Sequence, residues 1–127
     1  MIVVDASTAL SGLLAAGPAR QWLASEQLHA PHLIDSEVAS GLRRRVRARL
    51  LTAEQGWATL DTWRRIGITR YPVPGLVERI WQLRDNLSSY DAGYVALAEA
   101  LECPLVTADA RISGAPGLRC SVTVVPR

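Results

Sequence analysis

The sequence contains no lysine and no phenylalanine, and it has only two cysteines. So few cysteines exclude a disulfide-dense scaffold. Cys103 and Cys120 show neither C-x-x-C spacing nor a histidine pattern, so we expect two reduced core thiols rather than a zinc site. Receiver domains and haloacid-dehalogenase-like phosphatases rely on a lysine, so its absence argues against both. Neither G-x-x-x-x-G-K nor G-x-G-x-x-G occurs, which argues against a nucleotide-binding module.

Long apolar runs are also missing. The longest uncharged stretch near the N-terminus, residues 6–19, is shorter than the roughly 20 residues of a membrane helix. The chain opens with an apolar run that ends in Asp5, and not with the basic segment of a secretory signal. We therefore expect no membrane segment and a cytoplasmic protein.

The overall charge is small, with a formal net charge of +2 and a sequence pI of about 8.8. Such a balance does not predict nucleic-acid binding by itself, so any such function must rest on local clusters. The chain has 127 residues, of which 49% are hydrophobic, and this is enough for one compact core. The sequence predicts a single domain over residues 1–127.

Strand and helix patterns alternate along the chain. The predicted strands are short apolar runs at 1–4, 28–30, 68–73, 104–107 and 121–125. The predicted helices cover 7–16 and 19–25, then begin at Asp35 or Ser36, at a Thr52–Gln55 capping box, after Pro74-Gly75 and at Ser88 or Ser89. In the third helix a core-facing stripe is expected at Val38, Leu42, Val46 and Leu50. This alternation predicts an α/β fold with a mainly parallel central sheet and helices on both faces.

Four acidic residues follow predicted strands or open predicted helices. They are Asp5, Glu37, Asp91 and Asp109. Ligands gather at the carboxyl ends of parallel strands, and all four residues could meet at that edge of the sheet. Four carboxylates at one edge repel each other unless some are protonated or a cation lies between them. Oxygen ligands suit Mg²⁺ or Mn²⁺, whereas Zn²⁺ prefers histidine or cysteine.

Each acidic residue also has a structural interpretation when it is taken singly. An aspartate after a strand is often a turn residue, and an acid in the first helical turn is favoured by the helix dipole. The alternative hypothesis is therefore a non-catalytic α/β binding protein in which these acids are structural.

The neighbours of the acids carry a resemblance to a known family. The segments VVDAS at 3–7, SYDA at 89–92 and LVTAD at 105–109, with PHLIDSEV at 31–38 between the first two, resemble the PIN-domain fold. The length of the chain and the motif spacing resemble the VapC-type toxins of bacterial toxin–antitoxin modules, over essentially the whole chain.

This resemblance implies a three-layer, Rossmann-like fold and a Mg²⁺-dependent endoribonuclease. It also implies an RNA substrate, a cognate VapB-like antitoxin and a homodimer. The acidic metal-binding residues of the family fall on Asp5, Glu37, Asp91 and Asp109, and its small hydroxyl residues near the metal fall on Ser7 and Thr107. Some members carry a further acid shortly after the last one, where this chain has Arg111 and Ile112, so the number of metal ions stays open.

The chemistry of phosphodiester hydrolysis agrees with this set of residues. A carboxylate-held metal supplies a nucleophile at neutral pH and neutralises charge on the phosphoryl oxygens, so that no histidine base is required. We expect Asp5 and Asp91 to be the principal ligands and Asp109 to be a direct or water-mediated one. Glu37 would bind a second ion or orient the attacking water. Ser7 and Thr107 would bind metal waters or orient the carboxylates, or would simply cap turns.

Five arginines lie close together in and after the third predicted helix. They are Arg43, Arg44, Arg45, Arg47 and Arg49. Guanidinium groups match phosphate geometry, so Arg43, Arg44 and Arg47 are candidate contacts for RNA or for an acidic antitoxin segment. The alternative is a solvated helix face.

The aromatic residues and histidines carry no catalytic signal. Trp22, Trp57, Trp63 and Trp81 recur with aliphatic residues, which favours core or protein-interface positions over base stacking. His29 and His32 flank Pro31 with no nucleophile motif nearby, so we interpret both as structural.

Overall fold

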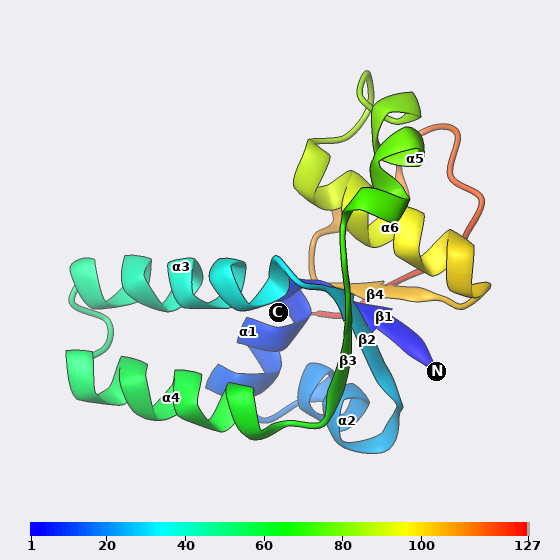
Figure 1. The fold of residues 1–127 in the computed structure, drawn as a ribbon. Coiled ribbons are helices and arrows are strands. Elements are labelled where there is room, and N and C mark those ends of the chain that lie inside the picture. Colours follow the sequence, from blue (N-terminus) through cyan, green and yellow to red (C-terminus); the bar gives the residue numbers. More distant parts are fainter. Residues whose placement is uncertain (127) are drawn as a thin grey trace.

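The computed structural model describes residues 1–126 and contains one five-stranded sheet (Figure 1). The strands are β1 (Ile2–Val4), β2 (Leu28–Pro31), β3 (Ile68–Tyr71), β4 (Leu105–Thr107) and β5 (Val122–Val124). Their order is β3-β2-β1-β4-β5, and each of the four pairings is parallel. The predicted parallel sheet is confirmed, and all its strands end at the same edge.

Helices cover both faces of this sheet. They are α1 (Ala6–Leu14), α2 (Pro18–Ser25), α3 (Ile34–Arg47), α4 (Ala53–Arg65), α5 (Val77–Gln82), α6 (Ser89–Leu101) and α7 (Ala110–Ser113), with a 3-10 turn, η1 (Pro74–Leu76), before α5. In Figure 1, α5 and α6 lie on one face, and α1 and α2 lie on the other. Helices α3 and α4 pack side by side and project beyond the sheet. The three-layer α/β architecture is therefore confirmed.

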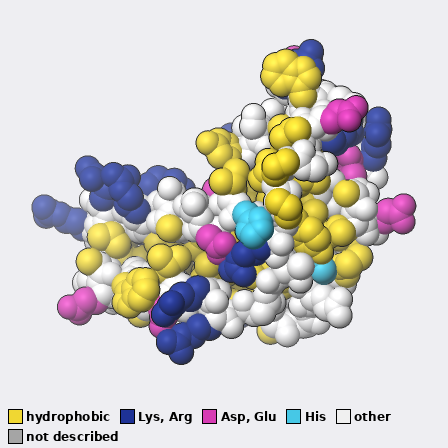
Figure 2. All heavy atoms as spheres, viewed as in Figure 1, with side chains coloured by type: hydrophobic (Ala, Val, Ile, Leu, Met, Phe, Trp, Pro, Cys, Tyr) yellow, Lys and Arg dark blue, Asp and Glu magenta, His cyan; other side chains and the backbone are white. Residues whose placement is uncertain are grey.

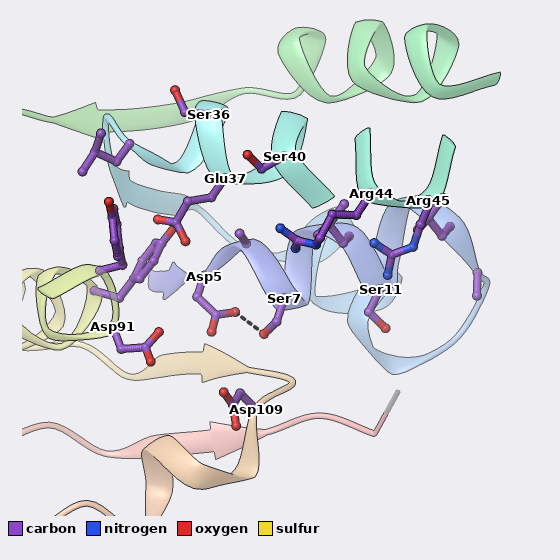
Figure 3. A pocket seen from close by; sticks show the side chains of 17 residues that line it. Asp5, Ser7, Ser11, Ser36, Glu37, Ser40, Arg44, Arg45, Asp91 and Asp109 are labelled. Atoms are coloured by element: carbon purple, nitrogen blue, oxygen red, sulfur yellow. Dashed lines mark hydrogen bonds between the residues drawn. The ribbon is translucent and has the colours of Figure 1, made fainter. Parts of the chain in front are cut away.

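The core lies around β1 and α6. Every residue of β1 is buried, because the strand is central in the sheet and covered on both faces. Helix α6 is buried along its middle, from Ala92 to Ala98, where it packs against β1, β2 and β4. Its N-terminal turn emerges from this core at the carboxyl edge of the sheet (Figure 3).

The start of α3 differs from the prediction. The helix begins at Ile34 after Leu33, which makes no side-chain cap, so Asp35 and Ser36 are not its N-cap. Asp35 instead binds other elements: Trp63 Nε1 donates to its Oδ1 at 2.9 Å, and Arg70 Nε donates to its Oδ2 at 2.7 Å. The Asp35 carboxylate therefore links α3 to α4 and β3.

The end of α3 also differs from the prediction. The helix ends at Arg47, and the chain turns through Arg49, whose φ is +61°, toward α4. Val38 and Leu42 are buried as expected, but Leu50 is 73% exposed. The predicted core stripe is therefore wrong at Leu50, because this residue lies in the turn and not in the helix.

Other element boundaries need small corrections. The predicted strand 68–73 stops at Tyr71, where its pairing with Pro31 ends and Pro72 offers no N–H. The predicted helix 7–16 stops at Leu14, and the four-residue α7 was not predicted. The capping box is confirmed, because Thr52 Oγ1 accepts from Gln55 N at 3.0 Å and Gln55 Oε1 accepts from Thr52 N at 2.9 Å.

The tryptophans divide into two groups. Trp63 is fully buried and Trp22 packs partly buried against the core. Trp57 and Trp81 are 58% and 68% exposed and therefore do not belong to the core of this chain. Their interface interpretation stays a prediction.

Cys103 and Cys120 are free thiols, the first buried and the second half-buried. His29 Nδ1 and the Tyr71 hydroxyl lie 2.8 Å apart in a hydrogen bond between β2 and β3, whereas His32 is exposed. In residues 1–126, no helix is both long and apolar enough to cross a bilayer.

Candidate metal centre

Asp5 occupies the junction between β1 and α1. It is 3% exposed and N-caps α1, with Oδ1 accepting from Thr8 N at 3.0 Å. Two hydroxyls also donate to it: Ser7 Oγ to Oδ1 at 2.7 Å, and Thr107 Oγ1 to Oδ2 at 2.5 Å. The carboxylate is therefore held from both sides in one orientation at the carboxyl edge of the sheet (Figure 3).

Ser7 and Thr107 connect the start of α1 to the end of β4 through Asp5. Besides donating to Asp5, Ser7 Oγ accepts from Ala108 N at 2.9 Å and Thr107 Oγ1 accepts from Asp109 N at 3.0 Å. Each hydroxyl has one proton, and both protons are donated to Asp5. The two residues therefore fasten the start of α1 to the segment that carries Asp109.

Glu37, Asp91 and Asp109 come from three further elements. Glu37 lies in the first turn of α3, and the buried Tyr94 hydroxyl donates to its Oε1 at 3.0 Å. Asp91 lies in the first turn of α6, where its backbone N donates to the Ser88 N-cap at 3.2 Å. Asp109 N-caps α7.

All four predicted acidic residues line one pocket of about 740 Å³. Their carboxylates turn toward each other across it in Figure 3. Burial raises the pKa of Asp91, and the charges of Asp5 and Asp109 raise it further. Burial also raises the pKa of Glu37, and the charges of Asp91 and Asp5 add to this effect. The sheet therefore brings the four predicted carboxylates close enough to repel each other.

The donor set of this pocket fits a hard cation. Within residues 1–126, no group of three or more His, Cys, Asp or Glu side chains is arranged to hold one ion by itself. Mg²⁺ commonly binds through one or two carboxylates and keeps several waters, so it does not need such a group. The described lining contains carboxylates and hydroxyls and has neither histidine nor cysteine, which disfavours Zn²⁺.

The other end of the pocket is basic. Arg44 and Arg45 line it near Ser40 and Ser11 (Figure 3). Arg43 and Arg47, which we also predicted as contacts, are exposed but do not belong to the lining, and dark-blue side chains gather at this free end of α3 in Figure 2. Arg49 lies outside the helix.

Three pocket or neighbouring residues were missed by sequence reasoning. Arg45 lines the pocket, Tyr94 binds Glu37, and Arg111 forms an ion pair with Asp109 at 2.8 Å. A signal existed for Tyr94, since it follows Asp91 by three residues and so shares a face of α6 with it. The roles of Arg45 and Arg111 depend on contacts that no spacing specified.

Comparisons with known proteins agree with this architecture. A family model of the PIN domain matches residues 2–118. Ribonuclease VapC9 from Mycobacterium tuberculosis (strain ATCC 25618 / H37Rv) is 62% identical over 127 residues, which cover 100% of both chains.

Two solved structures share the fold at low sequence identity. The sarcin-ricin loop cleaving toxin VapC20 from Mycobacterium tuberculosis superposes with a TM-score of 0.68 at 20% identity, covering 90% of this chain and 94% of that one. VapBC2 from Rickettsia felis, bound to a DNA fragment from their promoter, gives 0.71 at 12% identity, covering 97% and 98%. At these identities the likeness extends to the fold alone.

Proposed function

This chain belongs to the PIN-domain family and, within it, to the VapC ribonucleases, and from this premise we propose that it is the endoribonuclease toxin of a type II toxin–antitoxin module. It hydrolyses RNA phosphodiester bonds with a carboxylate-held Mg²⁺, for which Mn²⁺ can substitute. The observation that carries the proposal is the convergence of four carboxylates from four elements on one pocket that also has a basic end.

Asp5 and Asp91 would be the principal ligands of the metal ion, Asp109 would bind it directly or through a water, and Glu37 would bind a second ion or orient the attacking water. A bound divalent ion supplies a hydroxide at neutral pH and neutralises charge on the phosphoryl oxygens. Asp5 is suited to binding because its orientation is fixed by Ser7 and Thr107. Ligands held in this way do not reorient when the substrate arrives.

Tyr94 would position Glu37 for this reaction. Its hydroxyl donates to Glu37 Oε1 at 3.0 Å, and its ring is 1% exposed, so the carboxylate is anchored to the core of α6. Glu37 itself lines the pocket. A carboxylate held by one oxygen can accept a proton from water with the other.

The basic end of the pocket would bind the RNA backbone. Arg44 and Arg45 lie along the pocket from the acids, so one phosphate could lie at the carboxylates while a neighbouring one is bound by guanidinium groups. Arg43 and Arg47 extend the positive charge over the exposed face of α3. Single-stranded loops fit this arrangement best, because splayed strands expose single phosphates.

An antitoxin would bind the same pocket. The VapC relationship supports a VapB-like partner, and the pocket offers an acidic end and a basic end to such a segment. A partner segment that carries a basic side chain and an acidic one would match both. Co-purification with a small protein tests this partner, and the mass in solution tests the homodimer. Because its proposed substrate is cellular RNA, we propose a cytoplasmic location.

Cleavage of total cellular RNA by the purified, partner-free protein tests the proposed function. The wild type should make discrete cuts in Mg²⁺ and none in EDTA, and Asp91→Asn should make none in either. Asp61→Asn is the matched control, since Asp61 is a carboxylate of α4 that pairs with Arg64 away from the pocket. If folded Asp91→Asn cleaves as fast as the wild type, cleavage does not depend on Asp91 and the proposed carboxylate-held metal site is refuted.

A further inference from the structure

Arg111 occupies most of the Asp109 carboxylate. Its Nε and its backbone N each donate to Oδ1 at 3.0 Å, and its Nη2 donates to Oδ2 at 2.8 Å. A carboxylate offers about four acceptor positions, and Arg111 alone takes three of them. Any cation that binds Asp109 therefore competes with this guanidinium for the same oxygens.

The two partners differ in how firmly they are held. The Asp109 side chain is 16% exposed and belongs to a residue whose backbone N is bound by Thr107, whereas the Arg111 side chain is 89% exposed. Little packing holds the guanidinium in place, so its exchange to another anion costs little beyond the exposed ion pair itself.

Arg111 also acts on the rest of the acidic end. Its positive charge lowers the pKa of Asp91, against the larger raising effects of burial and of Asp5. The guanidinium therefore lies against Asp109, one of the four pocket carboxylates, and its charge also reaches Asp91. Its fork matches two phosphate oxygens as well as it matches a carboxylate.

We propose that Arg111 is a displaceable partner of Asp109, which gives up its place on this carboxylate to a divalent cation and then contacts the RNA phosphate beside it. The inference rests on the proposed nuclease function. It assigns to Arg111 a substrate contact that supplies positive charge at the edge of the site.

Mn²⁺ binding and RNA cleavage together test this role. Binding of Mn²⁺ is measured by calorimetry without RNA, and cleavage is measured at saturating Mg²⁺, for the wild type, Arg111→Ala and Arg111→Lys. Arg65→Ala is the matched control, because Arg65 is 72% exposed and pairs with Asp61 in α4, outside the pocket.

Arg111→Ala should bind Mn²⁺ up to about five-fold more tightly, because it removes an exposed competing ion pair. It should cleave RNA about ten-fold or more slowly at saturating metal, because it loses a charge-assisted contact to phosphate. Arg111→Lys should recover part of the rate, since it keeps the charge and loses the fork. Arg65→Ala should change neither quantity.

Weaker Mn²⁺ binding by Arg111→Ala would overturn the inference, because Arg111 would then be orienting Asp109 instead of competing for it. An unchanged rate at saturating metal would overturn the phosphate contact. Failure of the proposed function looks different: wild type and Asp91→Asn would then share one RNA cleavage rate, whatever Arg111→Ala does to Mn²⁺ binding.

Discussion

Asp91→Asn should make the protein more stable while it abolishes RNA cleavage. Asp91 is half-buried, and its carboxylate faces the charges of Asp5 and Asp109. Two like-charge interactions and the partial burial of a charge together destabilise the folded state by about 2 kcal/mol after solvent screening. Asparagine removes these costs and keeps nearly the same shape.

One favourable term is lost in the same substitution. Asp91 lies in the first turn of α6, where the helix dipole stabilises a negative charge by about 0.3–1 kcal/mol. The net gain in the free energy of unfolding is therefore about 1 kcal/mol at pH 7 in EDTA. For a domain of this size it corresponds to a rise in Tm of about 3–5 °C.

The pH dependence gives this prediction a second signature. The folded-state pKa of Asp91 is raised above its ordinary value of 3.8 by burial and by Asp5. Between the two values the folded protein binds more protons than the unfolded chain, so its stability falls as pH rises through this window. The advantage of Asp91→Asn should therefore be full at neutral pH and shrink toward pH 4.

Urea unfolding at pH 7 and near pH 4 measures these differences, with fluorescence of the buried Trp63 as the signal. Saturating Mg²⁺ should reverse the ranking, since ligand at about 100 times its Kd adds about 2.7 kcal/mol to the wild type alone. Asp61→Asn should gain no stability, because hydrogen bonds from Arg64 hold the pKa of Asp61 below its ordinary value. A variant Asp91→Asn that is no more stable than the wild type in EDTA would refute the repulsion argument.

Three other predictions concern the core, the α3 anchor and the basic end of the pocket. Trp63→Ala should lower the free energy of unfolding by about 3–5 kcal/mol in urea titrations, because the side chain is fully buried. Burial tends to raise the pKa of Asp35, but hydrogen bonds from Arg70 and Trp63 outweigh it and lower the pKa. The ionised Asp35 carboxylate should therefore stabilise the folded protein by about 1 kcal/mol, the value for a half-exposed ion pair, above pH 3.8, and this stabilisation should disappear as the pH falls through the folded-state pKa. The stability of Asp35→Asn should accordingly depend less on pH in acid unfolding than that of the wild type. Arg44→Ala should weaken RNA binding and reduce the slope of log K against log salt by about 0.7, and an unchanged slope would remove Arg44 from the RNA contacts.

The sequence determined the fold class and the acidic residues because both depend on local patterns. Short apolar runs alternating with amphipathic segments can bury their surfaces only as a covered parallel sheet. Asp5 was found because it directly follows such a run, Asp109 because it follows one by two residues, and Asp91 because Ser88 caps its helix. The position of a residue after a parallel strand already specifies the edge of the sheet at which it lies.

Tertiary structure decided which side chains each acid would meet. Asp35 looked like a helix cap in the sequence, but α3 begins at Ile34, and the Asp35 carboxylate instead binds Arg70 and Trp63 from distant segments. Arg111 on Asp109 and Tyr94 on Glu37 are likewise contacts that no local pattern specifies. Periodicity reports which face a residue occupies, whereas hydrogen bonds and ion pairs depend on how separate elements pack, and only the folded chain brings those elements together.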